Sequence, residues 1–451
     1  MPKRFFLVLI TLLFFFAPPA FAAGGAGGAS AAQLMLWIVI ILLAAKFASL
    51  VERIGQPPVL GELLVGVLLG NLILLGYDGF ETIKRDPILA FLAQLGVVIL
   101  LFQVGLETNV EEIRRVGARA FLVACIGVIV PFALGAIVVG PALLPGLSIN
   151  AYLFLGATLT ATSVGITARV FRDLGKLQTR EAQIVIGAAV IDDVLGLIIL
   201  AVVSAIATVG SVNAESVALI VLKATLFLAG SFYLGRRLAP RLNRLFSRIQ
   251  SAEGMKFTLA IVFCLAMAYL AEQIGLAAIV GAFAAGIILD PVHFREFDSP
   301  RIVDDLRATI DDAEPRIKAR VLSVMDRHAE RHIDHLVAPL GHFLVPIFFV
   351  LTGMSVRVDV FFDAPIVLTA LGITVAAFVG KIVSGIAAGN ANKWIVGWGM
   401  VPRGEVGLIF AATGKSLGVV SDAIFSMLVI VIILTTMLTP PVLSYLLRRQ
   451  K

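Results

Sequence analysis

Runs of apolar residues, separated by short polar segments, follow one another along almost the whole chain. Most of these runs approach the length of a helix that crosses a lipid bilayer, which is about 20 residues. Charges, prolines and glycines bound the runs and predict where each helix ends. Thirteen runs are present, near residues 34–51, 57–75, 88–106, 118–141, 150–171, 181–209, 217–235, 255–273, 276–290, 336–354, 364–387, 397–415 and 423–447.

The composition agrees with this pattern and excludes a soluble globular protein. Of the 451 residues, 59% are apolar and 15% are charged, whereas soluble domains average about 45–50% and about 25%. We predict an all-α polytopic membrane protein with a transmembrane domain over residues 34–447. Cys125 and Cys264 both lie inside apolar runs, so neither a disulfide framework nor a cysteine metal site is expected.

The N-terminal residues 1–22 have the features of a secretory signal peptide. Lys3 and Arg4 precede an apolar stretch, and Ala20-Phe21-Ala22 forms a small-x-small cleavage site. The alternative is a first membrane helix that is not cleaved. The short apolar stretch and the glycine-rich segment behind it favour the signal peptide.

The distribution of basic residues predicts the orientation in the membrane. If the signal peptide is removed, thirteen spans place the N-terminus outside and the C-terminus in the cytoplasm. Cytoplasmic loops of membrane proteins are enriched in lysine and arginine, and the net charge of +6 is explained in this way rather than by a nucleic-acid partner. The loops predicted to be cytoplasmic carry Arg114, Arg115, Arg172, Lys176, Arg180, Arg236, Arg237, Arg241, Arg244 and Arg248, and the external ones carry Lys84, Arg85, Arg357 and Lys415.

One predicted cytoplasmic loop, residues 291–335, is long and charged throughout. Apolar residues recur in it at helical spacing, which is consistent with a surface helix along the membrane. His328, His332 and His335 share one face of that helix. These histidines either form a pH sensor or metal site or lie on an ordinary solvated face, and the second reading is favoured.

Two adjacent acids, Asp192 and Asp193, lie inside the apolar run 181–209. A charge at the bilayer centre is costly and is a functional hypothesis by default. Two carboxylates so close together cannot both stay ionised at low dielectric without a cation or a partner, so one of them should bind a proton near neutral pH. This is the property that proton-for-cation exchange requires. A structural helix cap is the alternative.

A single lysine, Lys381, lies in the apolar run 364–387. A buried lysine needs a counter-ion or loses its proton. Pairing with Asp192 or Asp193 would provide the counter-ion. Otherwise, the side chain could extend to the cytoplasmic interface.

Two of the runs are interrupted by residues that break helices. The segment 402–407 contains a proline and two glycines beside Arg403 and Glu405, and the segment 158–165 contains a cluster of hydroxyl residues. Interrupted spans in matching positions of two halves are typical of the binding site of a secondary transporter. The hydroxyls of Thr160, Thr162 and Ser163 and the charge of Glu405 can satisfy the backbone groups that such breaks expose. Spans 4–6 and 11–13 would form the two repeats, which implies inverted repeats.

Six motifs together resemble the monovalent cation:proton antiporter 2 family over nearly the whole mature length. They are Arg53–Gly66 (RIGQPPVLGELLVG), Gly96–Glu107 (GVVILLFQVGLE), Thr160–Ser163 (TATS), Val190–Gly196 (VIDDVLG), Pro346–Val350 (PIFFV) and Pro402–Gly407 (PRGEVG). The resemblance implies a sodium/proton antiporter-type fold in which a six-helix core contains two crossed, broken helices. The core would comprise residues 118–209 and 364–447, and the remaining spans would form a scaffold for a homodimer with elevator-like movement.

The resemblance also implies roles for individual residues. Asp193 would bind the cation and the proton, and Asp192 would pair with Lys381 when no cation is bound. Thr162 and Ser163 would lie near the cation path, while Glu405 and Arg403 would neutralise the ends of the crossed helices. Paired acids with a lysine on a later core helix are associated, in such antiporters, with electrogenic sodium/proton exchange.

The expected function is therefore secondary active transport, without enzymatic activity, cofactor or resident metal. Sodium is the favoured cation, and the location is a multi-pass protein of a bacterial inner or plasma membrane that serves pH homeostasis. The nearest alternative is an electroneutral potassium/proton antiporter on the same fold, and a cation channel is more remote. An intramembrane aspartyl protease is disfavoured because its two aspartates must face each other from different helices, whereas Asp192 and Asp193 are neighbours on one.

Overall fold

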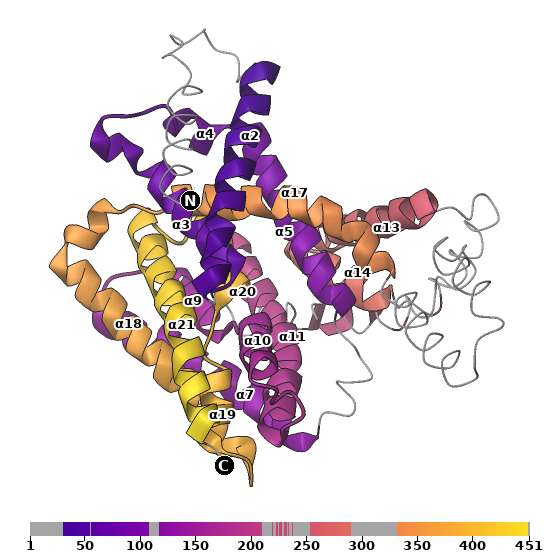
Figure 1. The fold of residues 1–451 in the computed structure, drawn as a ribbon, viewed down its shortest axis with the longest axis vertical. Coiled ribbons are helices and arrows are strands. Elements are labelled where there is room, and N and C mark those ends of the chain that lie inside the picture. The colour runs from indigo at the N-terminus through magenta and orange to yellow at the C-terminus, as the bar shows by residue number, and fades with distance from the viewer. Residues whose placement is uncertain are drawn as a thin grey trace. The chain divides into compact units, whose positions relative to one another are not determined.

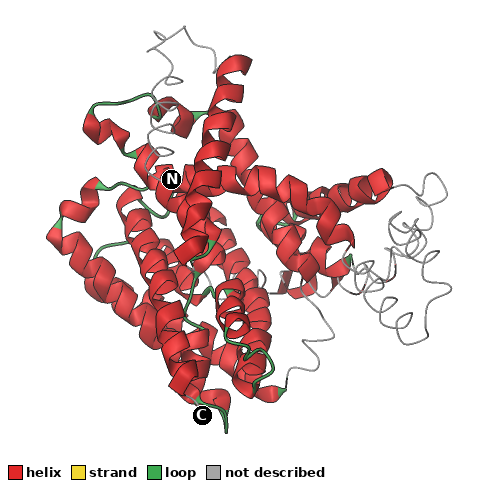
Figure 2. Ribbon diagram, in the orientation of Figure 1, coloured by secondary structure: helices red, strands yellow, loops and turns green. Residues whose placement is uncertain are grey.

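The computed structural model describes residues 30–54, 56–107, 117–209, 253–289 and 332–449, with scattered residues between 219 and 237. Every regular element within these ranges is a helix (Figure 2). The predicted signal peptide, the run 217–235 apart from scattered residues, and most of the loop 291–335 with His328 lie outside the described residues.

The helices fall into two compact units, and four long helices run through both. The first unit comprises residues 1–96, 126–182 and 343–451, and the second comprises residues 97–125 and 183–342. The helices shared between them are α5 (Pro87–Glu107), α7 (Ala118–Ala133), α11 (Arg180–Val209) and α17 (His332–Met354). The second unit also holds α13 (Glu253–Gln273) and α14 (Ala278–Ile288).

The remaining described elements, labelled in Figure 1 where there is room, lie within the residue ranges of the first unit. At its N-terminal side these are α2 (Ala31–Ala48), η1 (Ser49–Ile54), α3 (Pro58–Gly70), η2 (Leu72–Leu75) and α4 (Glu81–Arg85). The middle of the chain contributes η3 (Leu134–Val139), α8 (Gly140–Leu143), α9 (Ile149–Thr160) and α10 (Val164–Asp173). The C-terminal part contributes η5 (Asp359–Phe362), α18 (Ala364–Ile382), η6 (Val383–Ala388), α19 (Lys393–Gly399), α20 (Gly404–Ser416) and α21 (Asp422–Arg449).

Eight of the described helices are long and apolar enough to cross a membrane, and the bent pair α19 and α20 would make a ninth. Shorter apolar helices occupy residues 58–74, 149–160 and 278–288. The helices begin and end within a few residues of the predicted runs, although α17 begins at His332, inside the predicted loop 291–335. An all-helical, multi-pass membrane architecture follows, while the total of thirteen spans stays a prediction.

Side-chain caps explain where several helices start. Ser30 and Gln33 form a capping box at the start of α2, and the hydroxyl of Ser148 accepts from the backbone N–H of Ala151 at the start of α9. The carboxylate of Asp86 accepts from two backbone N–H groups at the start of α5. Such caps satisfy N–H groups that have no partner inside the helix.

A proline interrupts the regular α-helical hydrogen bonding of α7 where this helix packs against α9 and α18. Pro131 lies inside α7, and the π-helical segment η3 follows it, as expected where a proline removes one helical hydrogen bond. A Cβ placed on Gly135 would lie 2.8 Å from the Cα of Gly156, and one on Gly380 would lie 3.0 Å from the Cα of Pro131. The altered helix therefore packs directly against the backbones of α9 and α18.

Glycines let helices approach backbone to backbone in both units. In the first unit, a Cβ on Gly353 of α17 would lie 2.9 Å from the Cα of Gly66 and closer still to the carbonyl oxygen of Leu63 in α3. In the second unit, Gly105 of α5 and Gly286 of α14 form a similar contact. Small residues are common where membrane helices pack, because they allow close van der Waals contact where no hydrophobic effect drives helices together.

Replacing Gly353 by alanine should destabilise the protein, because the new methyl group would have to push α3 and α17 apart. We expect a loss of about 1–3 kcal/mol, the usual cost of overpacking, measured as a lower unfolding temperature in detergent. Gly254→Ala is the matched control, since nothing lies within 4 Å of a Cβ at that position. Equal unfolding temperatures for the two variants would contradict the close contact.

Candidate functional site

Two helices of the first unit are interrupted at sites that hydrogen-bond to each other. The helix α9 ends at Thr160 and α10 begins at Val164, with Ala161 in an extended conformation. The helix α19 ends at Gly399 and α20 begins at Gly404, with a bend of 48° between them. The breaks occur where hydroxyl residues and a proline–glycine sequence interrupt the apolar runs.

Glycine is needed at the second break for two reasons. Gly404 has a φ of +38°, which side chains of L-residues rarely adopt. A Cβ at this position would also lie 2.7 Å from the Cβ of Ser163. The absence of a side chain at Gly404 therefore permits the two interrupted segments to touch.

Four successive carbonyl groups, from Gly399 at the end of α19 to Pro402 before α20, each accept a hydrogen bond. The hydroxyl of Thr167 donates to the carbonyl of Gly399 at 2.6 Å, and that of Thr162 donates to Met400 at 3.2 Å. These two donors, and Ser163 below, belong to the first interrupted helix or its break. The remaining two bonds run from the guanidinium of Arg403 to Val401 at 2.9 Å and from the backbone N–H of Ser163 to Pro402 at 2.6 Å.

Arg403 is completely buried and joins three parts of the first unit. Besides its bond to Val401, its guanidinium donates to the carbonyl oxygen of Leu159 at 2.8 Å and to that of Ala377 in α18 at 3.0 Å. Leu159 lies in the last turn of α9, where the helix dipole is negative. The arginine thus combines its positive charge with a planar set of donors that matches several acceptors at once.

Glu405 lies at the opposite, positive ends of the interrupted helices. It occupies the first turn of α20, and the hydroxyl of Ser163, directly before α10, donates to its two carboxylate oxygens at 3.1 and 3.3 Å. A carboxylate is stabilised near helix N-termini. Arg403 and Glu405 therefore place opposite charges at opposite helix ends.

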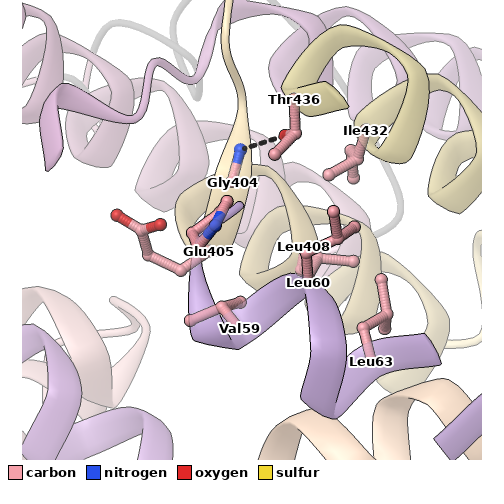
Figure 3. Close-up of a pocket in the computed structure, with 9 residues that line it drawn as sticks. Val59, Leu60, Leu63, Gly404, Glu405, Leu408, Ile432 and Thr436 are labelled. Carbon is pink, nitrogen blue, oxygen red and sulfur yellow. Dashed lines mark hydrogen bonds between the residues drawn. The ribbon is translucent and has the colours of Figure 1, made fainter. Parts of the chain in front are cut away.

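A small cavity adjoins Glu405, and Figure 3 shows its lining. The carboxylate of Glu405 points away from the leucines of this lining, and the backbone N–H of Gly404 donates to the hydroxyl of Thr436 at 3.3 Å. The lining residues are Pro57, Val59, Leu60, Leu63, Gly404, Glu405, Leu408, Ile432 and Thr436.

The three other predicted site residues are buried or partly buried within helices. Asp192 is 1% exposed and Asp193 is partly buried, both in the middle of the unbroken helix α11. Neither aspartate therefore caps a helix end. Lys381 in α18 is completely buried, and its Nζ lies 3.7 Å from the position of a Cβ on Gly127 of α7. Its side chain does not extend to a surface, and its pairing with Asp192 or Asp193 stays a prediction.

The structure thus brings Thr162, Ser163, Arg403 and Glu405 together at the facing breaks. Thr160, by contrast, donates to Ala157 within its own helix. Among the described residues there is no cluster of three or more His, Cys, Asp or Glu side chains that could hold a resident metal.

Two hydroxyl residues at this site, Thr167 and Thr436, lie outside the motifs that the sequence indicated. Thr167 lies four residues after Ser163, about one helical turn into α10. This spacing could have indicated from the sequence that Thr167 lies near the break. Thr436 had no such signal, because it lies in α21, among the apolar residues of a different helix.

The chain is similar in sequence to a known family and to individual members of it. A family model described as "Sodium/hydrogen exchanger, transmembrane" matches residues 38–311 and 321–449. The high-affinity Na(+)/H(+) antiporter NhaS3 of Synechocystis is 34% identical over 426 residues, which cover 86% of this chain and 84% of the relative. The Na(+)/H(+)-K(+) antiporter GerN of Bacillus cereus is 35% identical over 404 residues, which cover 88% and 92%.

The fold also resembles a solved structure, that of the sodium proton antiporter MjNhaP1 from Methanocaldococcus jannaschii at pH 8. The TM-score is 0.63, and the match covers 92% of this chain and 97% of the other. Because only 18% of the residues are identical, this likeness concerns the fold alone.

Replacing Arg403 by methionine should destabilise the first unit severely. The substitution removes the donors of three carbonyl groups, and hydrogen bonds to a charged group contribute about 1.5–3 kcal/mol each. Arg403→Lys should recover only part of the loss, because one ammonium group cannot reach acceptors in three directions.

The measurement is thermal unfolding of the purified protein in detergent. Arg357→Met is the control, because Arg357 forms an ion pair with Asp359 that is exposed to solvent, and surface pairs contribute little. An Arg403→Met variant as stable as wild type would show that the buried guanidinium does not hold the breaks together.

Proposed function

This chain belongs to the sodium/hydrogen exchanger family of secondary transporters, which are not enzymes, and we propose that it exchanges sodium for protons across a membrane. The observation that carries this proposal is the pair of facing helix breaks with Arg403 and Glu405 at their ends. Interrupted helices inside a membrane are tolerated where they line a binding site or cavity.

We propose that Asp193 and Asp192 hold the transported ions. The burial of Asp192 at 1% exposure supports this proposal, because a carboxyl group at such a position either holds a proton or, when ionised, requires a cation or a charged partner. Thr162 and Ser163 would offer hydroxyl oxygens near the cation path, and Lys381 would pair with Asp192 when no cation is bound. Arg403 and Glu405 would fix the helix ends electrostatically.

The coupling then follows from competition for one site. A proton on the aspartate pair excludes the cation, and a bound cation displaces the proton. Neither flux can proceed without the other, provided that the site opens to one side of the membrane at a time. Lower pH should therefore raise the cation concentration needed for half-maximal rate.

The finer architecture that we propose extends the all-helical fold. It comprises thirteen spans after a cleaved signal peptide, an external N-terminus and a cytoplasmic C-terminus. The core would contain inverted repeats formed by spans 4–6 and 11–13, and the remaining spans would form the scaffold of a homodimer. Elevator-like movement of the core in a bacterial inner or plasma membrane would serve pH homeostasis.

Potassium is a second candidate cation, favoured by one observation. The relative GerN, which is 35% identical, is named for potassium as well as sodium. Sodium and potassium both bind to oxygen ligands, so the residue types at the breaks suit either cation. Electroneutral potassium/proton exchange is therefore the alternative that the transport assay must separate.

Asp193→Asn should abolish cation-coupled proton movement, because asparagine keeps the shape of the side chain but cannot be ionised. The assay uses purified protein in liposomes with an imposed pH gradient, and it follows lumenal pH after addition of sodium, potassium or lithium. Asp78→Asn is the matched control, since Asp78 lies exposed in the loop before α4. No cation-dependent proton flux in the wild type would contradict the proposed function.

Sodium exchange should respond to the membrane potential if two protons move for each sodium ion. One net charge then crosses per cycle, and about 2.3 kcal/mol per 100 mV is available to drive it. We expect a potential that is negative on the proton-receiving side to accelerate the wild type when the potential is clamped at different values. A rate that is independent of potential and specific for potassium would instead support the electroneutral alternative.

A further inference from the structure

Thr167 is a completely buried residue of α10 that no sequence motif singled out. Its hydroxyl donates to the carbonyl oxygen of Gly399 at 2.6 Å, across 232 residues of sequence. We infer that Thr167 is a positioning residue for the cation site, acting through the end of α19. This inference rests on the proposed function and deepens it, because it names a residue that sets cation affinity and preference without itself binding the ion.

The direction of this hydrogen bond distinguishes Thr167 from other buried threonines. A threonine in a helix commonly donates to the carbonyl four residues earlier in the same helix. Thr158, Thr374 and Thr435 do so, with bonds of 2.8, 2.7 and 2.8 Å. The hydroxyl of Thr167 instead donates to a different helix, so its effect is a connection between two elements rather than a local bond.

The acceptor explains why this connection is needed. Gly399 is the last residue of α19, and a carbonyl at the end of a helix has no partner within it. No second donor to this oxygen is found among the described residues. Inside a membrane, water cannot take the place of the missing donor without cost.

Neighbouring bonds show that Thr167 belongs to a short series. Ser163 and Thr162 donate to Pro402 and Met400, the residues that follow Gly399 at the break. Thr167 lies one helical turn beyond them and completes the row of donors from the first interrupted helix to the end of the second. The row fixes the distance and the rotation between the two breaks, and hence the positions of Ser163 and Glu405.

Removal of the hydroxyl should therefore change how the cation is bound. Without its donor, the Gly399 carbonyl would no longer be held against α10, and the end of α19 would shift relative to Ser163 and Glu405. Alkali cations differ mainly in radius, so a small change in the spacing of oxygen ligands alters the order of preference among them. The groups that form a binding site must in general be held within about 0.5 Å of their working positions.

Thr167→Val tests this inference, because valine has nearly the shape of threonine but lacks the hydroxyl. In the liposome assay we expect the KM for sodium to rise about tenfold, a loss of about 1.4 kcal/mol in cation-binding free energy, because the displaced oxygens would bind the ion less well. The preference among lithium, sodium and potassium should change as well. The maximal rate should stay within about twofold of wild type, and Thr167→Ser should restore the wild-type KM.

Thr374→Val is the matched control, since it makes the same chemical change at a buried threonine whose bond lies within its own helix. Sodium-dependent thermal stabilisation of the purified proteins gives a second reading that does not require transport. We expect more sodium to be needed for half-maximal stabilisation of Thr167→Val, and no change for Thr374→Val.

Three outcomes would overturn the inference. In the first, Thr167→Val lowers only the unfolding temperature and the maximal rate, with KM and cation preference unchanged, which would indicate a merely structural role. In the second, Thr167→Ser behaves like Thr167→Val, so the hydroxyl is not the cause. In the third, Thr374→Val raises KM equally. These failures differ from failure of the proposed function, in which the wild type itself shows no cation-coupled proton movement and the inference fails with it.

Discussion

Backbone groups exposed by a broken helix must find partners inside the membrane, and the core of the first unit is built around this requirement. The break between α19 and α20 presents four successive carbonyl groups, from Gly399 to Pro402, and each one accepts a hydrogen bond from a hydroxyl, a backbone N–H or the guanidinium of Arg403. Three of those donors belong to the first interrupted helix. Each break therefore depends on the other, because burying either one alone would leave backbone carbonyl groups without hydrogen-bond donors, which costs free energy.

Two charges, on Arg403 and Glu405, also stabilise the ends of the interrupted helices. Arg403 meets the C-terminal carbonyls of α9, and Glu405 lies where α10 and α20 begin. The two opposite charges complement the helix dipoles at their respective ends. The proposed mechanism assigns the binding of protons and cations to a different pair of residues, the aspartates Asp192 and Asp193 of α11.

Close packing permits this arrangement. Gly404 has no Cβ to collide with Ser163, and Gly380 and Gly135 bring α18 and α9 against the irregular part of α7. The closest helix contacts thus place backbone against backbone, with little room for adjustment by side chains. Rigid support of this kind suits a site that must distinguish cations of similar chemistry, because selectivity depends on fixed distances between oxygen ligands. A hydroxyl such as that of Thr167 can then influence the ion from a distance.

The sequence by itself determined the helical membrane architecture, the places where two helices are interrupted, and the presence of Arg403, Glu405, Asp192 and Asp193 in apolar surroundings. These features are local, since helix length, helix breakers and the cost of a buried charge can be evaluated from neighbouring residues. Only the tertiary structure decided which carbonyl groups Arg403 reaches, that Ser163 donates to Glu405, and that Thr167 connects α10 to α19. Those partners are far apart along the chain, and a hydroxyl that leaves its own helix has the same sequence pattern as one that does not.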